Sequence, residues 1–265
     1  MIPAEKYVTD ERHFYAQLLK TLTAARLPFL VGGTYAFNCY VDFPRETRDL
    51  DLFLDRRNYQ RIAQALKKEG YEVDLVFPHW LAKVRQGDTH VDLIFSSGNG
   101  IAEVDDVWFE YATQGVVLGV PVSLLPAEEM IWSKAFIMER ERYDGADVAH
   151  LIKARAMELD WHRLLQRFGT HWRVLFSHLL LFGFIYPDER DLIPEWVLDR
   201  LWYKLRQEKP AATQNLCNGT LLSREQYLGD MAQGYEDGRL FPYGMMSAKD
   251  IANWTAAIEP HDNGG

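Results

Sequence analysis

Residues 49–54 read Asp-Leu-Asp-Leu-Phe-Leu, so two carboxylates stand at the start of an apolar run. Residues i and i+2 of a β-strand point to the same face, which predicts that Asp49 and Asp51 project together while Leu50 and Leu52 are buried. Two carboxylates on one face repel each other unless a cation lies between them. A nucleotide is the usual ligand of such a cation. The stretch therefore predicts a central strand that carries a divalent-metal site.

A double glycine, Gly32-Gly33, lies upstream between an apolar segment at 27–31 and a helical pattern that begins at Thr34. Glycine lets the backbone turn tightly and lets a phosphate approach the main-chain amides. At the start of a helix, those amides and the helix dipole favour an anion. Gly32, Gly33 and the Thr34 hydroxyl are therefore candidate phosphate ligands, although an ordinary Gly-Gly turn is the alternative for the pair taken alone.

A third carboxylate, Asp92, lies inside another apolar run at 90–95. Unpaired carboxylates are costly in a buried strand, and a bound cation accounts for their presence there. Asp55 follows the first run and is expected to cap the next helix instead. For each acidic position alone, a solvent-facing strand is the alternative, but the joint occurrence with the glycines is far more specific.

These motifs resemble the nucleotidyltransferase superfamily related to DNA polymerase β. The resemblance rests on an apolar residue before Gly32-Gly33, the Asp-apolar-Asp-apolar pattern at 49–52, and Asp92. The preceding residues 45–48 resemble those of minimal, AbiEii-like nucleotidyltransferases. The resemblance implies an α/β (α+β) fold, in which a polymerase-β-like core with a mixed sheet flanked by helices is followed by a helical C-terminal region.

The resemblance extends to a helix that contains Lys134 and to the segment at 140–151. It implies that Lys134 contacts the triphosphate, a role that suits the compact charge of lysine. Arg48, Asp144 and Asp147 are possible accessory residues by the same resemblance. Helix capping and surface solvation are the alternatives for the two aspartates.

In this interpretation Asp49 and Asp51 hold two Mg²⁺ ions, and Asp92 is either a metal ligand or a base. The enzyme would transfer a nucleoside monophosphate from an NTP to a hydroxyl group and release pyrophosphate. The acceptor would be RNA or a protein, as for the toxin half of a toxin–antitoxin pair with an antitoxin partner. One alternative is a cationic small molecule such as an antibiotic, attracted by acidic residues such as Asp105 and Asp106. Another is a non-catalytic antitoxin or protein-binding module.

The composition limits these options. The chain has 265 residues, 48% hydrophobic residues and a net charge of −9, which indicate a sizeable core and argue against nonspecific coating of nucleic acid. Its two cysteines have no metal-ligand spacing. The N-terminus lacks the pattern of a signal peptide, and the longest apolar run, 174–186, is too short for a bilayer. A cytoplasmic protein without a membrane partner is expected.

Hydrophobic periodicity predicts alternating strands and helices first, and helices later. Expected strands are 27–31, 50–54, 72–76, 81–86, 89–95, 116–119 and 121–124. Expected helices are 10–26, 34–40, 58–69, 126–140, 144–157, 160–167, 170–184, 194–208, 223–237 and 247–258. A linker at 209–220 and a disordered tail at 261–265 complete the prediction. The expected domains are a nucleotidyltransferase catalytic core at 1–125 and a helical C-terminal region at 126–265.

Overall fold

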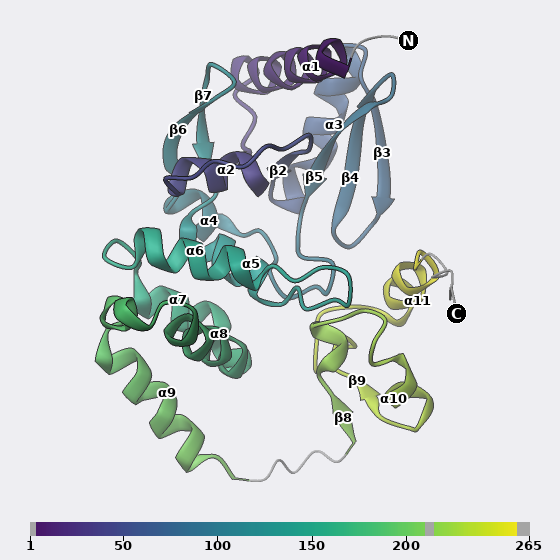
Figure 1. Cartoon of the computed structure of the whole chain (residues 1–265). Helices are drawn as coiled ribbons and strands as arrows, with labels where there is room; N and C mark the ends of the chain where they lie inside the picture. Colours follow the sequence, from purple (N-terminus) through teal and green to yellow (C-terminus); the bar gives the residue numbers. More distant parts are fainter. Residues whose placement is uncertain (1–3, 210–214, 259–265) are drawn as a thin grey trace.

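The fold is built on a seven-stranded sheet in the order β3-β4-β5-β2-β1-β7-β6 (Figure 1). The computed structural model describes residues 4–209 and 215–258. The strands are β1 Leu30–Val31, β2 Leu50–Phe53, β3 Glu72–Phe77, β4 Leu81–Gln86, β5 Thr89–Ile94, β6 Thr113–Val117 and β7 Val120–Leu124. β2 runs parallel to β5 and β1 parallel to β7, while the other neighbours are antiparallel. The predicted mixed sheet is confirmed.

Four helices belong to the first half of the chain: α1 Ala4–Ala24, α2 Gly33–Tyr40, α3 Tyr59–Lys68 and the short α4 Asp106–Glu110, which the sequence did not predict. α1 buries Phe14, Leu18 and Leu22, which recur at helical spacing. It contacts β7 and α3, whereas α2 contacts β2. These contacts fix α2 beside the strand that carries Asp51.

The helices that follow lie below the sheet in Figure 1. They are α5 Ala127–Ala135, α6 Gly145–Arg155, α7 Trp161–Phe168, α8 Trp172–Ile185 and α9 Glu195–Gln207. α6 contacts both α5 and α2, and so links the helical part to the sheet. A single buried apolar cluster extends from Phe14 of α1 through the sheet to Leu201 of α9.

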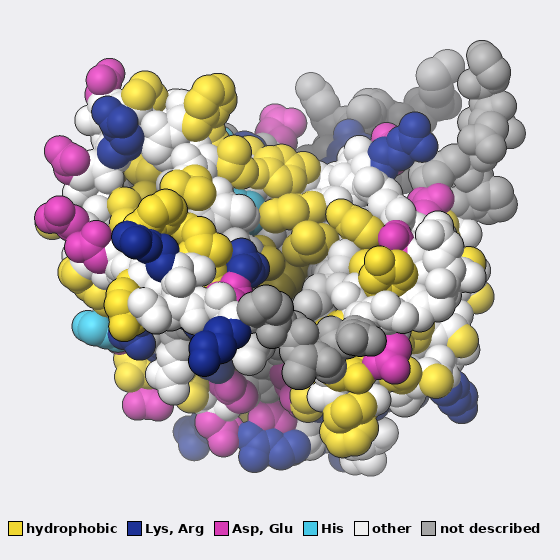
Figure 2. Space-filling view, turned by 90° about the horizontal axis from the view of Figure 1, so that it is seen from below, with side chains coloured by type: hydrophobic (Ala, Val, Ile, Leu, Met, Phe, Trp, Pro, Cys, Tyr) yellow, Lys and Arg dark blue, Asp and Glu magenta, His cyan; other side chains and the backbone are white. Residues whose placement is uncertain are grey.

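The last segment contains β8 Leu216–Cys217, α10 Leu228–Ala232, β9 Glu236–Asp237 and α11 Ala248–Ala256. It returns to the sheet, because Trp254 of α11 packs against Trp80 with ring centroids 6.4 Å apart. The side-chain amide of Asn99 also donates to the carbonyl of Leu221 at 2.6 Å. Figure 2 shows the whole molecule from below, with a hollow near the centre of this face and hydrophobic side chains exposed around the hollow.

Three predicted helices are wrong in extent. The helix expected at 10–26 begins earlier, at Ala4, and ends at Ala24. The helix expected at 126–140 ends at Ala135, because Met138 pairs with Tyr143 and donates its backbone amide to the Leu222 carbonyl. The helix expected at 223–237 is reduced to α10, since Gly234 has a φ of +96° and the chain then forms β9.

The hairpin of β6 and β7 turns earlier than expected. Leu118 and Gly119 both adopt positive φ, 51° and 77°, and form a two-residue turn, whereas the prediction included them in the first strand and left only residue 120 between the strands. β6 therefore begins at Thr113 instead of 116. The predicted tail at 261–265, and the part of the predicted linker at 210–214, lie outside the described residues.

Within the described ranges, none of the helices combines the length and apolarity required to cross a membrane.

Candidate functional site

Asp51 and Asp92 lie directly opposite each other on the neighbouring parallel strands β2 and β5. The register continues outward, since Asp92 faces Lys83 of β4 and Lys83 faces Asp74 of β3. Residues in register share a face of the sheet. Four ionisable side chains therefore form a cross-strand row, Asp74-Lys83-Asp92-Asp51, with two adjacent carboxylates at its inner end.

The charge in this row is balanced at Asp92 and unbalanced at Asp51. The Lys83 Nζ lies 3.2 Å from Oδ1 of Asp92 and 2.9 Å from Nε2 of His90, which itself lies 3.7 Å from that oxygen. The Asp51 carboxylate forms no ion pair with any described residue. Burial, and next the charge of Asp92, raise the pKa of Asp51 to about 6, although Lys134 opposes the shift. Negative charge is thus concentrated where a cation would relieve it.

The glycine pair allows α2 to approach β2 closely. A Cβ on Gly33 would lie 1.9 Å from Oδ2 of Asp51, and a Cβ on Gly32 would lie 2.2 Å from the Phe53 ring. Gly32 also donates its backbone amide to the Asp51 carbonyl at 2.9 Å. The predicted strand, glycine turn and helix are confirmed, with a strand of only two residues and with Thr34 in the first turn of α2.

Asp49 lies immediately before β2 and is exposed. Its backbone amide donates to the Thr47 hydroxyl, and its carbonyl accepts from the same hydroxyl. Among the described residues, no three His, Cys, Asp or Glu side chains are grouped so that they could hold a metal ion. The predicted set of Asp49, Asp51 and Asp92 therefore does not form such a group. The structure brings Asp51 and Asp92 together as two oxygen ligands, and the charge of Asp51, which has no ion pair with any described residue, fits a magnesium ion.

Lys134 lies at the centre of an ion-pair network next to this site. Its Nζ is 2.9 Å from Oδ2 of Asp144 and 2.7 Å from Oδ2 of Asp147. Arg142 binds Asp144 through two hydrogen bonds of 3.0 and 2.9 Å, and Arg45 lies 2.8 Å from Asp147. Lys134 and Arg142 both oppose the raised pKa of Asp51, which places this network within electrostatic reach of the carboxylates.

Burial alone would raise the pKa of Asp144, but its hydrogen bond and charge contacts with Arg142 and Lys134 prevail and lower it. Asp144 precedes α6, yet its side chain forms no capping hydrogen bond. The predicted accessory residues Asp144 and Asp147 therefore lie together with Lys134. The side chain of Arg48 is exposed and has no partner among the described residues, whereas its backbone carbonyl accepts a hydrogen bond from the Tyr15 hydroxyl.

Sequence reasoning missed Lys83, His90 and Arg142 as site residues. Arg57 pairs with Asp55, which caps the turn after β2 as expected. The acidic residues suggested for a cationic acceptor are largely engaged: Asp105 accepts two hydrogen bonds from Arg167, and Asp106 pairs with Arg57.

A hollow of about 280 Å³ adjoins the network between α1, α2 and the loop before β2. Arg12 and Tyr35 line one side of it, and Arg45 and Thr47 line the other. Two residues of its lining also contact the site residues, since Arg45 binds Asp147 and Thr47 binds the backbone of Asp49.

No curated protein sequence matches the chain, whereas several solved structures and one family model do. The solution structure of the antibiotic-resistance factor ANT(2'')-Ia is 17% identical with a TM-score of 0.45, covering 64% of this chain and 97% of that one. A nucleotidyltransferase-like antigen of Paracoccidioides brasiliensis is 18% identical with a TM-score of 0.44, covering 69% and 91%. The lincosamide adenylyltransferase LnuA is 13% identical with a TM-score of 0.37, covering 53% and 94%.

A family model described as "uncharacterised nucleotidyltransferase" matches residues 13–181. This match includes the glycine pair, the three aspartates, Lys134 and the two accessory aspartates. It covers more than half of the chain, and the protein therefore belongs to this family of nucleotidyltransferase enzymes.

Proposed function

We propose that this enzyme transfers a nucleoside monophosphate from an NTP to a hydroxyl acceptor in a Mg²⁺-dependent reaction. The observation that carries the proposal is the pairing of Asp51 with Asp92 on adjacent parallel strands, with the raised pKa of Asp51. Asp51 has no ion pair with any described residue and lies opposite the Asp92 carboxylate, and a metal that also binds phosphate oxygens would relieve this repulsion.

Asp51 and Asp92 would hold the metal, and we assign Asp49 as a further ligand when two ions are bound. The ions would supply charge neutralisation for the leaving pyrophosphate and a lowered pKa for the acceptor hydroxyl. Asp92, which lies beside Lys83 and His90, would either hold the metal or accept the proton of that hydroxyl.

The triphosphate would be held by the N-terminal turn of α2, where Gly33 and Thr34 present backbone amides. The Gly32 amide is bonded to the Asp51 carbonyl, so Gly32 would contribute a close approach of the backbone without a side chain. Lys134 would contact it from the opposite side, exchanging part of its contact with Asp144 and Asp147 for phosphate oxygens. The acceptor oxygen then bonds to the α-phosphorus while the bond from that phosphorus to the β-phosphate oxygen breaks. The hydroxyl proton leaves the acceptor, and pyrophosphate leaves the site.

The acceptor is proposed as a hydroxyl group of RNA, of a protein or of a small molecule. The resemblance to AbiEii-like enzymes favours a macromolecular acceptor and a role as a toxin that an antitoxin neutralises. Because the chain belongs to an enzyme family, we favour an active enzyme over a non-catalytic antitoxin or protein-binding module. If the protein is a toxin, its expression should arrest growth of the host cell, and expression of the Asp51→Asn variant should not.

The test is a transfer assay with each α-³²P-labelled NTP and Mg²⁺, using total tRNA, a protein extract and a small-molecule extract as separate acceptor pools. Label should move into one pool, and Asp51→Asn and Asp92→Asn should each abolish the transfer. Calorimetric titration with a non-hydrolysable NTP gives a readout that does not need the acceptor. Binding should require Mg²⁺ and should weaken in both variants.

Asp74→Asn is the matched control, because Asp74 lies in the same cross-strand row but on β3, beyond Lys83. It should retain transfer and NTP binding. Full transfer by Asp51→Asn would exclude the proposed site.

A further inference from the structure

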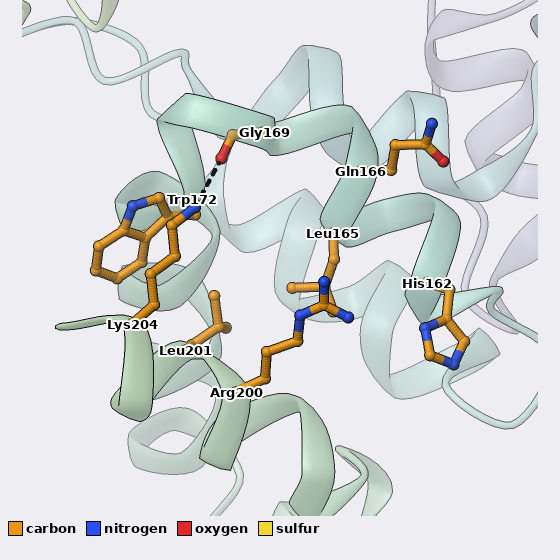
Figure 3. Close-up of a pocket in the computed structure, with 8 residues that line it drawn as sticks. All are labelled: His162, Leu165, Gln166, Gly169, Trp172, Arg200, Leu201 and Lys204. Carbon is orange, nitrogen blue, oxygen red and sulfur yellow. Dashed lines mark hydrogen bonds between the residues drawn. The ribbon is translucent and has the colours of Figure 1, made fainter. Parts of the chain in front are cut away.

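A second cavity, of about 520 Å³, opens between α7 and α9, with the first residue of α8 at one end (Figure 3). Its floor is apolar and consists of Leu165, Leu201 and Trp172. Leu201 and Trp172 are buried and belong to the main core, so the floor is rigidly supported. A volume of this size is in the range of roughly 300–1,000 Å³ that small-molecule sites occupy.

The rim of the cavity is basic. Arg200 and Lys204 lie one helical turn apart on α9, and His162 faces them from α7. Figure 3 shows the guanidinium of Arg200 extending from α9 toward α7, and the ammonium of Lys204 reaching toward Gly169. None of the lining residues carries a carboxylate. In a chain with a net charge of −9, this arrangement leaves an excess of positive charge around an apolar floor.

The two cations are poorly satisfied. The side chain of Arg200 has no ion pair and no hydrogen bond with any residue in the described ranges, so its five donors face the cavity or solvent. Within the same ranges the Nζ of Lys204 donates only to the Gly169 carbonyl, at 3.3 Å, and it lies 5.3 Å from the centre of a Trp172 ring. By contrast, Arg163 and Arg167 of α7, the helix on the other side of the cavity, both form ion pairs with Glu129. The rim cations of the cavity are therefore available for a ligand.

We infer that this cavity binds a small organic anion, with a planar ring on the apolar floor beside Trp172 and a phosphate or carboxylate group between Arg200 and Lys204. Guanidinium groups bind such oxyanions through paired hydrogen bonds, and an ammonium adds a further charge-assisted bond. His162, whose ring stacks on Trp196 with centroids 4.4 Å apart, closes the opposite end.

A small ligand fits better than a nucleic acid strand. On the face seen in Figure 2, Lys and Arg side chains are separated from one another by acidic and hydrophobic side chains. A polyanion requires an extended basic surface, whereas this cavity offers a localised one.

The site is separate from the proposed transfer centre. Its lining residues come from α7 to α9, and α9 lies beyond the residues that the family model matches. Ligand binding in this cavity can therefore be tested without the transfer reaction.

Phenyl phosphate and benzoate are suitable probes, read by the indole N–H signal of Trp172 in ¹H–¹⁵N NMR spectra and assigned with Trp172→Phe. A saturable shift of this signal is expected with at least one probe, and uncharged phenol should bind at least 10-fold more weakly. The double variant Arg200→Gln/Lys204→Gln should weaken binding at least 10-fold. Arg206→Gln, on the same helix but outside the lining, should leave it unchanged.

Asp51→Asn should also bind the probes normally, which separates this cavity from the transfer centre. Circular dichroism must show that the double variant remains folded, and Arg200→Lys, which retains charge, should bind with intermediate affinity. An unmoved Trp172 signal at millimolar probe, or equal binding by the double variant, would overturn the inference. The inference would also be overturned if a fluorescein-labelled oligonucleotide bound through the same residues and neither small probe bound.

Discussion

Gly33 and Asp51 approach each other so closely that only a hydrogen atom fits between them. A Cβ built on Gly33 would lie 1.9 Å from Oδ2 and 2.8 Å from Cγ of Asp51. Gly33 also has a φ of +54°, a conformation that costs other residues free energy. The position of the Asp51 carboxylate and the start of α2 are therefore set together.

Gly33→Ala should displace Asp51 as well as strain the backbone. We expect a loss of about 1–3 kcal/mol in the free energy of unfolding and a fall in transfer rate of roughly 100-fold, because a small displacement of a reacting group is costly. Urea unfolding and initial-rate measurements test the two effects separately.

Gly70→Ala is the control for backbone strain alone. Gly70 has a φ of +88°, and nothing lies within 4 Å of a Cβ built on it. It should lose stability but keep its transfer rate. If Gly33→Ala behaves in the same way, the contact with Asp51 has no functional role.

Asp51→Asn should stabilise the protein at neutral pH. The pKa of Asp51 is raised from 3.8 to about 6 in the folded state, so the folded form favours the proton. As pH rises from about 4 to about 6, ionisation should cost the native state on the order of 3 kcal/mol. Thermal unfolding should therefore show a variant more stable than the wild type above pH 6 and little different below pH 4.

Asp74→Asn serves as the comparison here too, since the Asp74 side chain is 60% exposed and lies near Arg85. It should not reproduce this pH dependence. Parallel stability curves for the wild type and Asp51→Asn across the whole range would contradict the assigned cause.

Lys134→Met should destabilise the protein, because Asp144 and Asp147 are only 11% and 10% exposed and would lose a shared cation. Arg142 and Arg45 remain as partners, so we expect a cost of about 2 kcal/mol. Adding Asp147→Asn should recover part of it. A double-mutant cycle from urea unfolding measures this coupling, and strictly additive effects would show that the network is not energetically connected.

Lys83→Met should tighten metal binding. The Lys83 ammonium lies 3.2 Å from the Asp92 carboxylate and competes with a cation for it. Its removal is expected to lower the Kd for Mn²⁺ by roughly 3- to 10-fold, about 1 kcal/mol. Electron paramagnetic resonance of free Mn²⁺ during titration measures this directly.

The control for Lys83→Met is Arg85→Met, on the same strand but paired with Asp74. It should leave Mn²⁺ affinity unchanged. Weaker Mn²⁺ binding by Lys83→Met would mean that Lys83 supports the site instead of competing for it.

Local patterns were sufficient to predict much of this arrangement. The apolar alternation around Asp51 and Asp92, and the glycine pair before α2, are each encoded within a few residues. The partner of Asp92 was also accessible, because a two-residue turn at Gly87-Asp88 fixes the hairpin register and so places Lys83 opposite it. That inference was not drawn from the sequence.

Other features depend on contacts that no local pattern reports. Asp49 does not continue β2, since the Thr47 hydroxyl binds its backbone on both sides. α5 stops at Ala135, whose carbonyl accepts from the distant His178. Arg142 lies in the aperiodic connection that follows, so its place within electrostatic reach of the distant Asp51 depends on the tertiary fold.

Lys134 and Arg142 follow residue 125, whereas Asp51 and Asp92 precede it, and one apolar cluster spans both sides of that position. A polypeptide cut there would divide the cationic and anionic parts of a single site between two fragments, each with an exposed apolar surface. Neither fragment could carry out the proposed transfer alone, but their reassembly would restore it. The chain is thus suited to fragment complementation, in which recovered activity reports that two fused partners have met.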